Sequence, residues 1–124
     1  MIAYTCVGTN QLEKAVAFYE ALLGEVLGAS IFFRTPDGVG FGVEPGKPMF
    51  AVLRPFDGKP ATVGNGVMIS LAASGPDQVR ALHAKALALG ATDEGAPGPR
   101  GDGAFFAAYF RDLDGNKLAA FCHA

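Results

Sequence analysis

The fold is decided by residues 2–24, IAYTCVGTNQLEKAVAFYEALLG, in which a strand pattern gives way to a helix pattern. Ile2–Gly8 is an apolar run typical of a strand, and apolar residues then recur at helical spacing. Asn10 can cap this helix, with Glu13 as the second half of a capping box, and Gly24 is expected to end it. Three further strands are expected, separated by turns rich in proline and glycine, at Val26–Thr35, Val39–Glu44 and Pro48–Leu53.

The second half of the chain repeats this order after a polar link, residues 57–66. Residues 67–90, VMISLAASGPDQVRALHAKALALG, predict a strand at Val67–Ala73 and then a helix that begins near Pro76 and ends at Gly90. A short strand near Ala91–Asp93, a glycine- and proline-rich loop and a hairpin complete the unit. That loop, Glu94–Gly103, is expected to be unpacked, as either a lid or a mobile connector. The hairpin strands are expected at Phe105–Arg111 and Lys117–Cys122, around Asp114 and Gly115.

These patterns predict a single domain of the α+β class over residues 1–124, with an internal repeat of about 1–56 and 65–124. Each repeat has the order βαβββ. A unit of this kind leaves one face of its sheet uncovered, so two units must pack together or share a cavity. We therefore expect paired, curved, mixed sheets around a cup-like cavity, with the helices on the outside.

Composition excludes several classes of protein. Half of the 124 residues are hydrophobic and 18% are charged, which is enough apolar surface to close a core and argues against disorder. The net charge of -2, with ten scattered basic residues, offers no footprint for nucleic acid or an anionic membrane. No membrane span and no leader pattern is found, so a cytoplasmic location is predicted. Cys6 and Cys122 lie in apolar strand patterns and are expected to be buried, inert thiols.

Three segments resemble those of a known superfamily, and the resemblance extends over essentially the whole chain. They are the opening Tyr4–Thr9, the helix start Leu12–Tyr19 and the closing Tyr109–Leu118. Together they resemble the vicinal oxygen chelate superfamily, which includes glyoxalase I, extradiol dioxygenases and bleomycin-resistance proteins. The closing segment is similar to that superfamily's Arg-Asp-Pro-Asp-Gly-Asn signature, with Leu113 in place of the proline. The resemblance implies the fold, and the reaction must be argued from the residues of the site.

The resemblance also implies where a metal would be held, because metal-dependent members take four ligands from the first and last strands of both units. The corresponding positions are Tyr4, Met68 and Ala119, with the fourth near Phe50. A catalytic zinc ion normally keeps three ligands drawn from imidazole, carboxylate and thiolate groups. The two histidines, His83 and His123, lie outside the central strands. We therefore predict no metal and no other cofactor.

Strand alternation predicts what lines the cup instead: an apolar surface with few polar groups, suited to a small molecule. The alternative is that side chains such as Met68, Phe50 and Phe121 fill the space and form ordinary core. Arg54, at the junction of the repeats, could hold a carboxylate or phosphate, whereas Arg111 has the alternative of an exposed ion pair. The candidate pocket residues are Tyr4, Arg34, Phe50, Arg54, Met68, Ser70, Tyr109, Arg111, Ala119 and Phe121.

Three functions remain open on the sequence alone. The first is a metal-free protein that binds a small, partly apolar molecule, as the bleomycin-resistance proteins sequester theirs. The second is a glyoxalase-type lyase or isomerase, or a dioxygenase, whose divalent metal is held by displaced ligands such as Tyr4, Glu44 or His123. The third is an interaction module with a filled core. The resemblance also implies a homodimer, and no nucleic-acid or membrane partner is expected.

Overall fold

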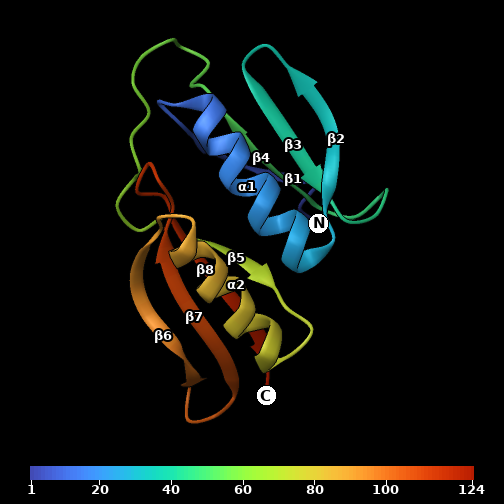
Figure 1. Ribbon diagram of the computed structural model, residues 1–124, viewed down its shortest axis with the longest axis vertical. Helices are drawn as coiled ribbons and strands as arrows, with labels where there is room; N and C mark the ends of the chain where they lie inside the picture. Colours follow the sequence, from blue (N-terminus) through green and yellow to red (C-terminus); the bar gives the residue numbers. More distant parts are fainter. The chain divides into compact units, whose positions relative to one another are not determined.

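The computed structural model describes residues 1–124 as two compact units, Met1–Val63 and Gly64–Ala124 (Figure 1). Each unit contains one helix and one four-stranded mixed sheet, so the predicted α+β class with two βαβββ units is confirmed. In chain order the elements are β1 (Tyr4–Gly8), α1 (Leu12–Leu27), β2 (Ser30–Thr35), β3 (Gly38–Gly42), β4 (Met49–Leu53), β5 (Ile69–Ala72), α2 (Pro76–Ala88), β6 (Thr92–Arg100), β7 (Phe105–Arg111) and β8 (Lys117–His123).

The sheet of the first unit has the strand order β1-β4-β3-β2, with β1 parallel to β4 and the other pairs antiparallel. Helix α1 packs on one face of this sheet and contacts β2, β3 and β4. The Tyr19 ring of α1 lies 4.7 Å from the ring of Phe50 on β4, measured between centroids. Phe50 therefore lies on the helix-covered face. Tyr19, Leu22, Phe41 and Val52 are almost fully buried in this core.

The expected ends of the first helix are wrong at both positions. Its N-cap residue is Gln11, without a side-chain cap, because the Asn10 side chain instead bonds the main chain of Ala61 at 2.7 and 3.2 Å. At the other end the helix continues through Gly24 and is capped by Gly28, whose φ of 71° is left-handed. A glycine inside a helix costs only about 1 kcal/mol, which burial of neighbouring leucines outweighs. The following strand consequently begins at Ser30 and not at Val26.

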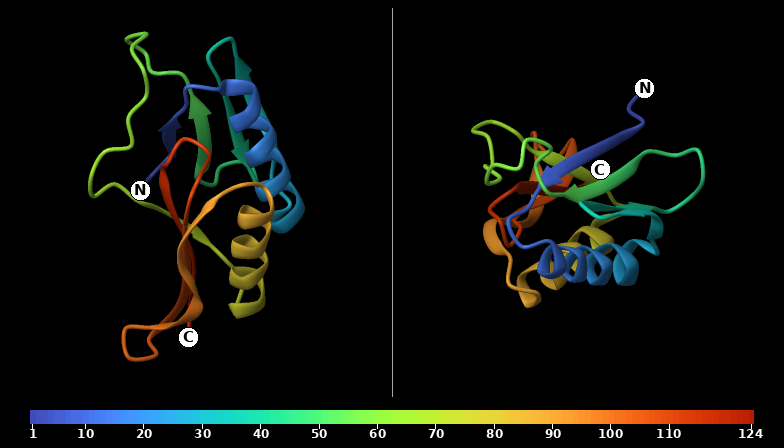
Figure 2. Two further views of the ribbon diagram at one scale, coloured as in Figure 1. Left: turned by 60° about the vertical axis from the view of Figure 1, so that its left-hand side comes forward. Right: turned by 90° about the horizontal axis from the view of Figure 1, so that it is seen from above.

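The second unit has the strand order β5-β8-β7-β6, again with its first pair parallel and the rest antiparallel. Helix α2 packs on one face, against β6, β7 and β8 (Figure 2). The buried side chains Val79, Leu82 and Ala86 of α2 meet a face that includes Phe110 and Leu118. The opposite face, on which the side chains of alternate residues lie, is not covered by this helix.

The expected unpacked loop at Glu94–Gly103 is wrong. Residues 92–100 form β6, which pairs antiparallel with β7 from Thr92 opposite Arg111 to Arg100 opposite Phe105. The pairing has two register irregularities, between Asp93 and Gly95 and between Gly95 and Gly98, so the glycine-rich segment fits into the strand. Because β6 is an edge strand, its prolines need no partner on the open side. The segment is thus part of the sheet, and only the turn after Arg100 is loop.

The two cysteines are free, but only Cys122 is buried. Cys6 lies exposed on β1, so the expectation that both are buried is wrong for Cys6. Partial desolvation raises the pKa of the Cys6 thiol, which favours the protonated, unreactive form. Neither helix has the length and hydropathy that a membrane span needs.

Candidate functional site

The open face of the second sheet carries a hollow of about 520 Å³. The strand register brings its residues together, because Ala119 of β8 lies opposite both Ser70 of β5 and Tyr109 of β7. Ala72 is likewise opposite Phe121. Side chains of paired residues share a face, so they point into the same space. The lining residues are Met68, Ser70, Ala72, Phe105, Tyr109, Ala119 and Phe121.

Five of the ten residues predicted to line a pocket lie together in this hollow: Met68, Ser70, Tyr109, Ala119 and Phe121. Phe105 was not among the predicted residues, although it shares the parity of Tyr109 along β7 and could have been found by alternation. Its ring stands 5.1 Å from that of Phe121. The hollow is therefore walled by aromatic rings, with the hydroxyl groups of Ser70 and Tyr109 as its polar groups.

Tyr109 is also the centre of a cationic surface beside the hollow. The guanidinium of Arg100 lies 5.7 Å from the centroid of the Tyr109 ring, and the ammonium of Lys117 lies 5.7 Å from the same centroid. Both separations are within cation–π range. At the far end of β8, His123 stands edge-on to Phe121 at 5.1 Å.

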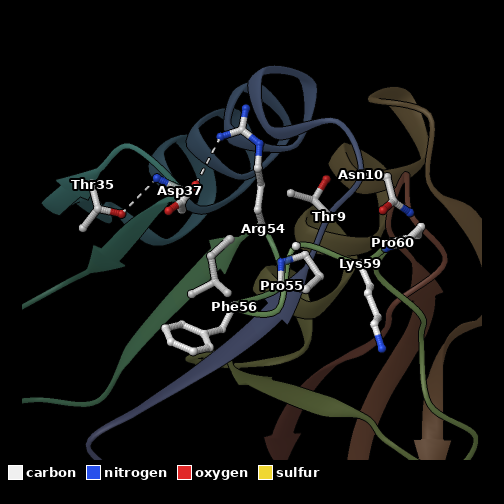
Figure 3. Close-up of a pocket in the computed structure, with 11 residues that line it drawn as sticks. Thr9, Asn10, Thr35, Asp37, Arg54, Pro55, Phe56, Lys59 and Pro60 are labelled. Atoms are coloured by element: carbon white, nitrogen blue, oxygen red, sulfur yellow. Dashed lines mark hydrogen bonds and ion pairs between the residues drawn. The ribbon is translucent and has the colours of Figure 1, made fainter.

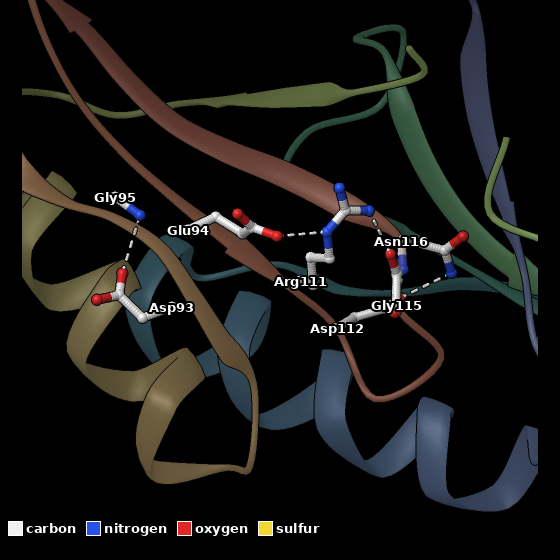
Figure 4. Close-up of polar contacts among 7 residues, drawn as sticks. All are labelled: Asp93, Glu94, Gly95, Arg111, Asp112, Gly115 and Asn116. Carbon is white, nitrogen blue, oxygen red and sulfur yellow. Dashed lines mark hydrogen bonds and ion pairs between the residues drawn. The ribbon is translucent and has the colours of Figure 1, made fainter. Parts of the chain in front are cut away.

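Arg111 shares this face but lies outside the lining of the hollow. Its Nε donates to a carboxylate oxygen of Glu94 at 2.6 Å, and one terminal nitrogen donates to the carbonyl of Gly115 at 2.9 Å (Figure 4). These bonds hold the guanidinium between β6 and the turn that follows β7. The ion pair that the sequence offered as the alternative for Arg111 is therefore present, and its partner is Glu94 on β6.

The other predicted pocket residues belong to the first unit and do not gather around one space. Tyr4 is 55% exposed on β1, and Arg34 is exposed on β2. Phe50, with 7% of its surface exposed, is held in the core against Tyr19.

Arg54 lines a different, more polar hollow of about 650 Å³ in the first unit (Figure 3). One of its terminal nitrogens donates to the carbonyl of Pro36 at 2.9 Å and lies 3.8 Å from the carboxylate of Asp37. Two other polar groups of the lining also have partners, because Thr9 Oγ1 accepts from the Gln11 amide and the Asn10 amide bonds Ala61. Arg54 is therefore already neutralised in part, which weakens it as an anion site.

The residues at the family's metal-ligand positions do not fit a metal ion. Tyr4, Met68 and Ala119 bring no imidazole or carboxylate, and Phe50 points to the core. Neither unit contains a group of three or more His, Cys, Asp or Glu side chains close enough to share a metal. Glu44 is exposed in the turn after β3, and His123 packs against Phe121.

The remaining histidine, His83, has a structural partner. Buried on α2, it contacts the Asp93 carboxylate of β6 through Nε2 at 2.9 Å, and the same carboxylate oxygen accepts from the Gly95 amide at 2.9 Å. The hydrogen bond with His83, followed by that with Gly95, lowers the pKa of Asp93 below its ordinary range. This contact joins the edge strand to the helix on the covered face.

The lowered pKa of Asp93 predicts a pH-dependent contribution to stability. Because the folded state favours the carboxylate, the contribution is present above about pH 4 and is lost as pH falls through the folded-state pKa. The Asp93→Asn variant should melt below the wild type at about pH 7, and the two should converge in strong acid. Thermal melts followed by circular dichroism check this, with Asp102→Asn as a control at an exposed carboxylate. A gap that is constant with pH would contradict it.

Comparison with known proteins agrees with the fold. A sequence model of the Glyoxalase/Bleomycin resistance protein/Dioxygenase superfamily matches residues 1–120. The crystal structure of a glyoxalase/bleomycin resistance protein from Albidiferax ferrireducens T118 is 38% identical, with a TM-score of 0.86 over 98% of this chain and 97% of that one. The chain therefore belongs to the Glyoxalase/Bleomycin resistance protein/Dioxygenase superfamily.

More distant structures share the same architecture. A hypothetical protein from S. aureus is 25% identical, with a TM-score of 0.72 over 98% of this chain and 91% of that chain. A lactoylglutathione lyase from Agrobacterium tumefaciens is 23% identical, with a TM-score of 0.69 over 98% and 92%, a likeness of fold alone. No curated protein sequence matches the chain. The particular ligand and reaction must therefore be argued from this chain's own residues.

Proposed function

We propose that the hollow on the open face of the second sheet binds a small, partly apolar molecule, and that this binding needs no metal ion. The observation that carries the proposal is the convergence of side chains from β5, β7 and β8 on one aromatic-walled space. Its volume of about 520 Å³ lies within the usual range of small-molecule sites.

The chemistry of the lining supports a partly apolar ligand. Phe105, Tyr109 and Phe121 offer ring faces and edges, and Met68 offers a polarizable side chain that adapts to shape. Ser70 can donate or accept one hydrogen bond, which orients a ligand without making the site hydrophilic. No group in the lining is an evident general base or nucleophile, so binding is favoured over conversion.

The donor set at the family's ligand positions, which holds neither imidazole nor carboxylate, supports metal independence. The metal-dependent lyase or dioxygenase needs displaced ligands, and no observation in either unit favours one. We also propose a homodimer, which the resemblance implies, and a cytoplasmic location, which the sequence predicts.

Filling the hollow should abolish binding. Ala72 is exposed and lines the hollow, so an Ala72→Trp side chain would occupy the space without entering the core. We expect this variant to bind N-phenyl-naphthylamine, an uncharged dye that brightens in apolar surroundings, at least about tenfold more weakly than the wild type. Fluorescence titration measures the affinity, and treatment with a chelator should leave the wild-type value unchanged.

The matched control is Ala84→Trp, at an exposed position of α2 outside the hollow. It adds the same side chain and should leave the dye affinity unchanged. Both variants should unfold within about 0.5 kcal/mol of the wild type, as is usual for surface substitutions. Equal dye binding by wild type and Ala72→Trp would show that the hollow is not the site, and loss of binding after chelation would refute metal independence.

A further inference from the structure

Three cations surround the Tyr109 side of the hollow, and a single carboxylate, that of Glu94, is paired with them. They are Arg100 on β6, Arg111 on β7 and Lys117 on β8. The register places Lys117 opposite Arg111, and Tyr109 opposite Ala119, so Lys117 and Tyr109 lie on the same face. The edge of the apolar hollow at Tyr109 is therefore positively charged.

The two arginines are already occupied by the protein. Arg100 donates to the carbonyls of Ala96 at 2.7 Å and Pro99 at 3.1 Å. Arg111 is held by Glu94 and by the Gly115 carbonyl. These bonds use two of the five donors of each guanidinium and fix both groups to β6 and to the turn after β7, so the protein sets their positions.

Lys117 differs from both arginines. It is half-buried, it has neither a carboxylate partner nor, unlike Arg100 and Arg111, a side-chain bond to a main-chain carbonyl, and its ammonium lies 5.7 Å from the centroid of the Tyr109 ring. The Tyr109 ring face gives the Lys117 ammonium a contact worth only about 0.5–2 kcal/mol. An anion placed beside Lys117 would restore a full charge partner, with up to three donors available to it. A ligand that complements this site would therefore carry an anionic group beside Lys117 and an aromatic group in the hollow.

We propose that the hollow binds small aromatic carboxylates, with the ring between Tyr109 and Phe121 and the carboxylate on Lys117. This inference rests on the proposed function and adds the class of ligand and a residue that selects it. An aromatic body suits the rings of the lining, and a carboxylate suits a compact point charge with rotatable donors. Lys117 is then the specificity-determining residue, although it is not part of the lining of the hollow.

A pair of probes that differ only in charge tests this inference. Naphthoate carries the carboxylate, and naphthamide is a neutral molecule of nearly the same shape. We expect the wild type to bind naphthoate about tenfold more tightly than naphthamide, by isothermal titration calorimetry at low salt. In Lys117→Met, which keeps the apolar stem and removes the charge, the two affinities should agree within about twofold. Roughly 1 M salt should also weaken naphthoate more than naphthamide.

The matched control is Lys14→Met, which removes the same charge from an exposed position on α1 and should keep the wild-type preference. Equal binding of both probes by the wild type would overturn the choice of anion and leave the proposed function intact. Equal weakening of both probes in Lys117→Met would reduce Lys117 to a packing role and would also overturn the inference. If neither probe nor N-phenyl-naphthylamine binds the wild type, the proposed function fails, and the inference fails with it.

Discussion

The Phe110→Ala variant is expected to lose about 3–5 kcal/mol of the free energy of unfolding. Phe110 is fully buried on β7, where it pairs with Leu118 across β8 and lies on the face covered by α2. Removing its ring leaves a cavity between the helix and the sheet, where Leu82 is also fully buried. Rigid strands on both sides limit how far the cavity can collapse, so the cost should fall in the upper part of the range for core truncations.

Urea denaturation followed by circular dichroism measures this loss, and a shifted midpoint at an unchanged slope would assign it to stability. Phe56→Ala is the matched control, because Phe56 is fully exposed and its truncation should cost less than about 0.5 kcal/mol. A loss below about 1 kcal/mol for Phe110→Ala would contradict the packing of α2 on this face.

The strands that carry the hollow were the most predictable part of the fold. Phe105–Arg111 was expected with the bounds that the structure shows, and its partner Lys117–Cys122 differs by one residue. Both are apolar runs joined by an Asp-Gly turn, a signal that is local in sequence. Ser70, expected in the pocket, lies on the open face, and its neighbour Leu71 lies in the core.

The errors arose where tertiary contacts outweighed local signals. Gly24 predicts a helix end. The helix instead continues past the buried leucines that precede Gly24 and ends before Gly28, whose backbone is left-handed. The glycines and prolines of β6 predict a loop. In the structure they form an edge strand with two register irregularities, because β7 provides the hydrogen-bonding partners along it. Neither packing partner is visible within a short window of sequence.

The candidate site was predicted in part. Ser70, placed on the open face by strand alternation, and Met68 and Ala119, placed at the pocket by the resemblance, meet in the hollow. Phe50 was placed with the pocket by family resemblance, and the structure places it on the helix-covered face against Tyr19. Lys117 has the same parity as Ala119 and could have been found, but its lack of a charge partner is a property of the folded sheet.

The turn between β7 and β8 explains why the closing segment Arg111–Asn116 is so distinctive in sequence. Asp112 is buried, and one of its carboxylate oxygens accepts from the amides of Asp114 and Asn116, both at 2.9 Å. Figure 4 shows Asp112 beside Asn116 in this turn. The other oxygen accepts from the Asn116 side chain at 3.0 Å. Leu113 can occupy the position where the family has proline, because these bonds fix the turn. The Leu113 side chain lies beside Gly90.

The Asp112→Ala variant is therefore expected to lose about 2–4 kcal/mol of the free energy of unfolding. It removes three bonds to a charged acceptor, one from Asp114 and two from the buried Asn116. Asp57→Ala is a matched control, because Asp57 makes the same kind of turn with a single exposed bond to the Lys59 amide at 2.9 Å. That variant should lose less than about 1 kcal/mol. Urea denaturation of both variants measures the difference. Equal losses would mean that burial adds nothing to the Asp112 turn, whereas a large loss confined to Asp112→Ala would show that this turn holds β7 and β8 in register and, with them, the wall of the hollow.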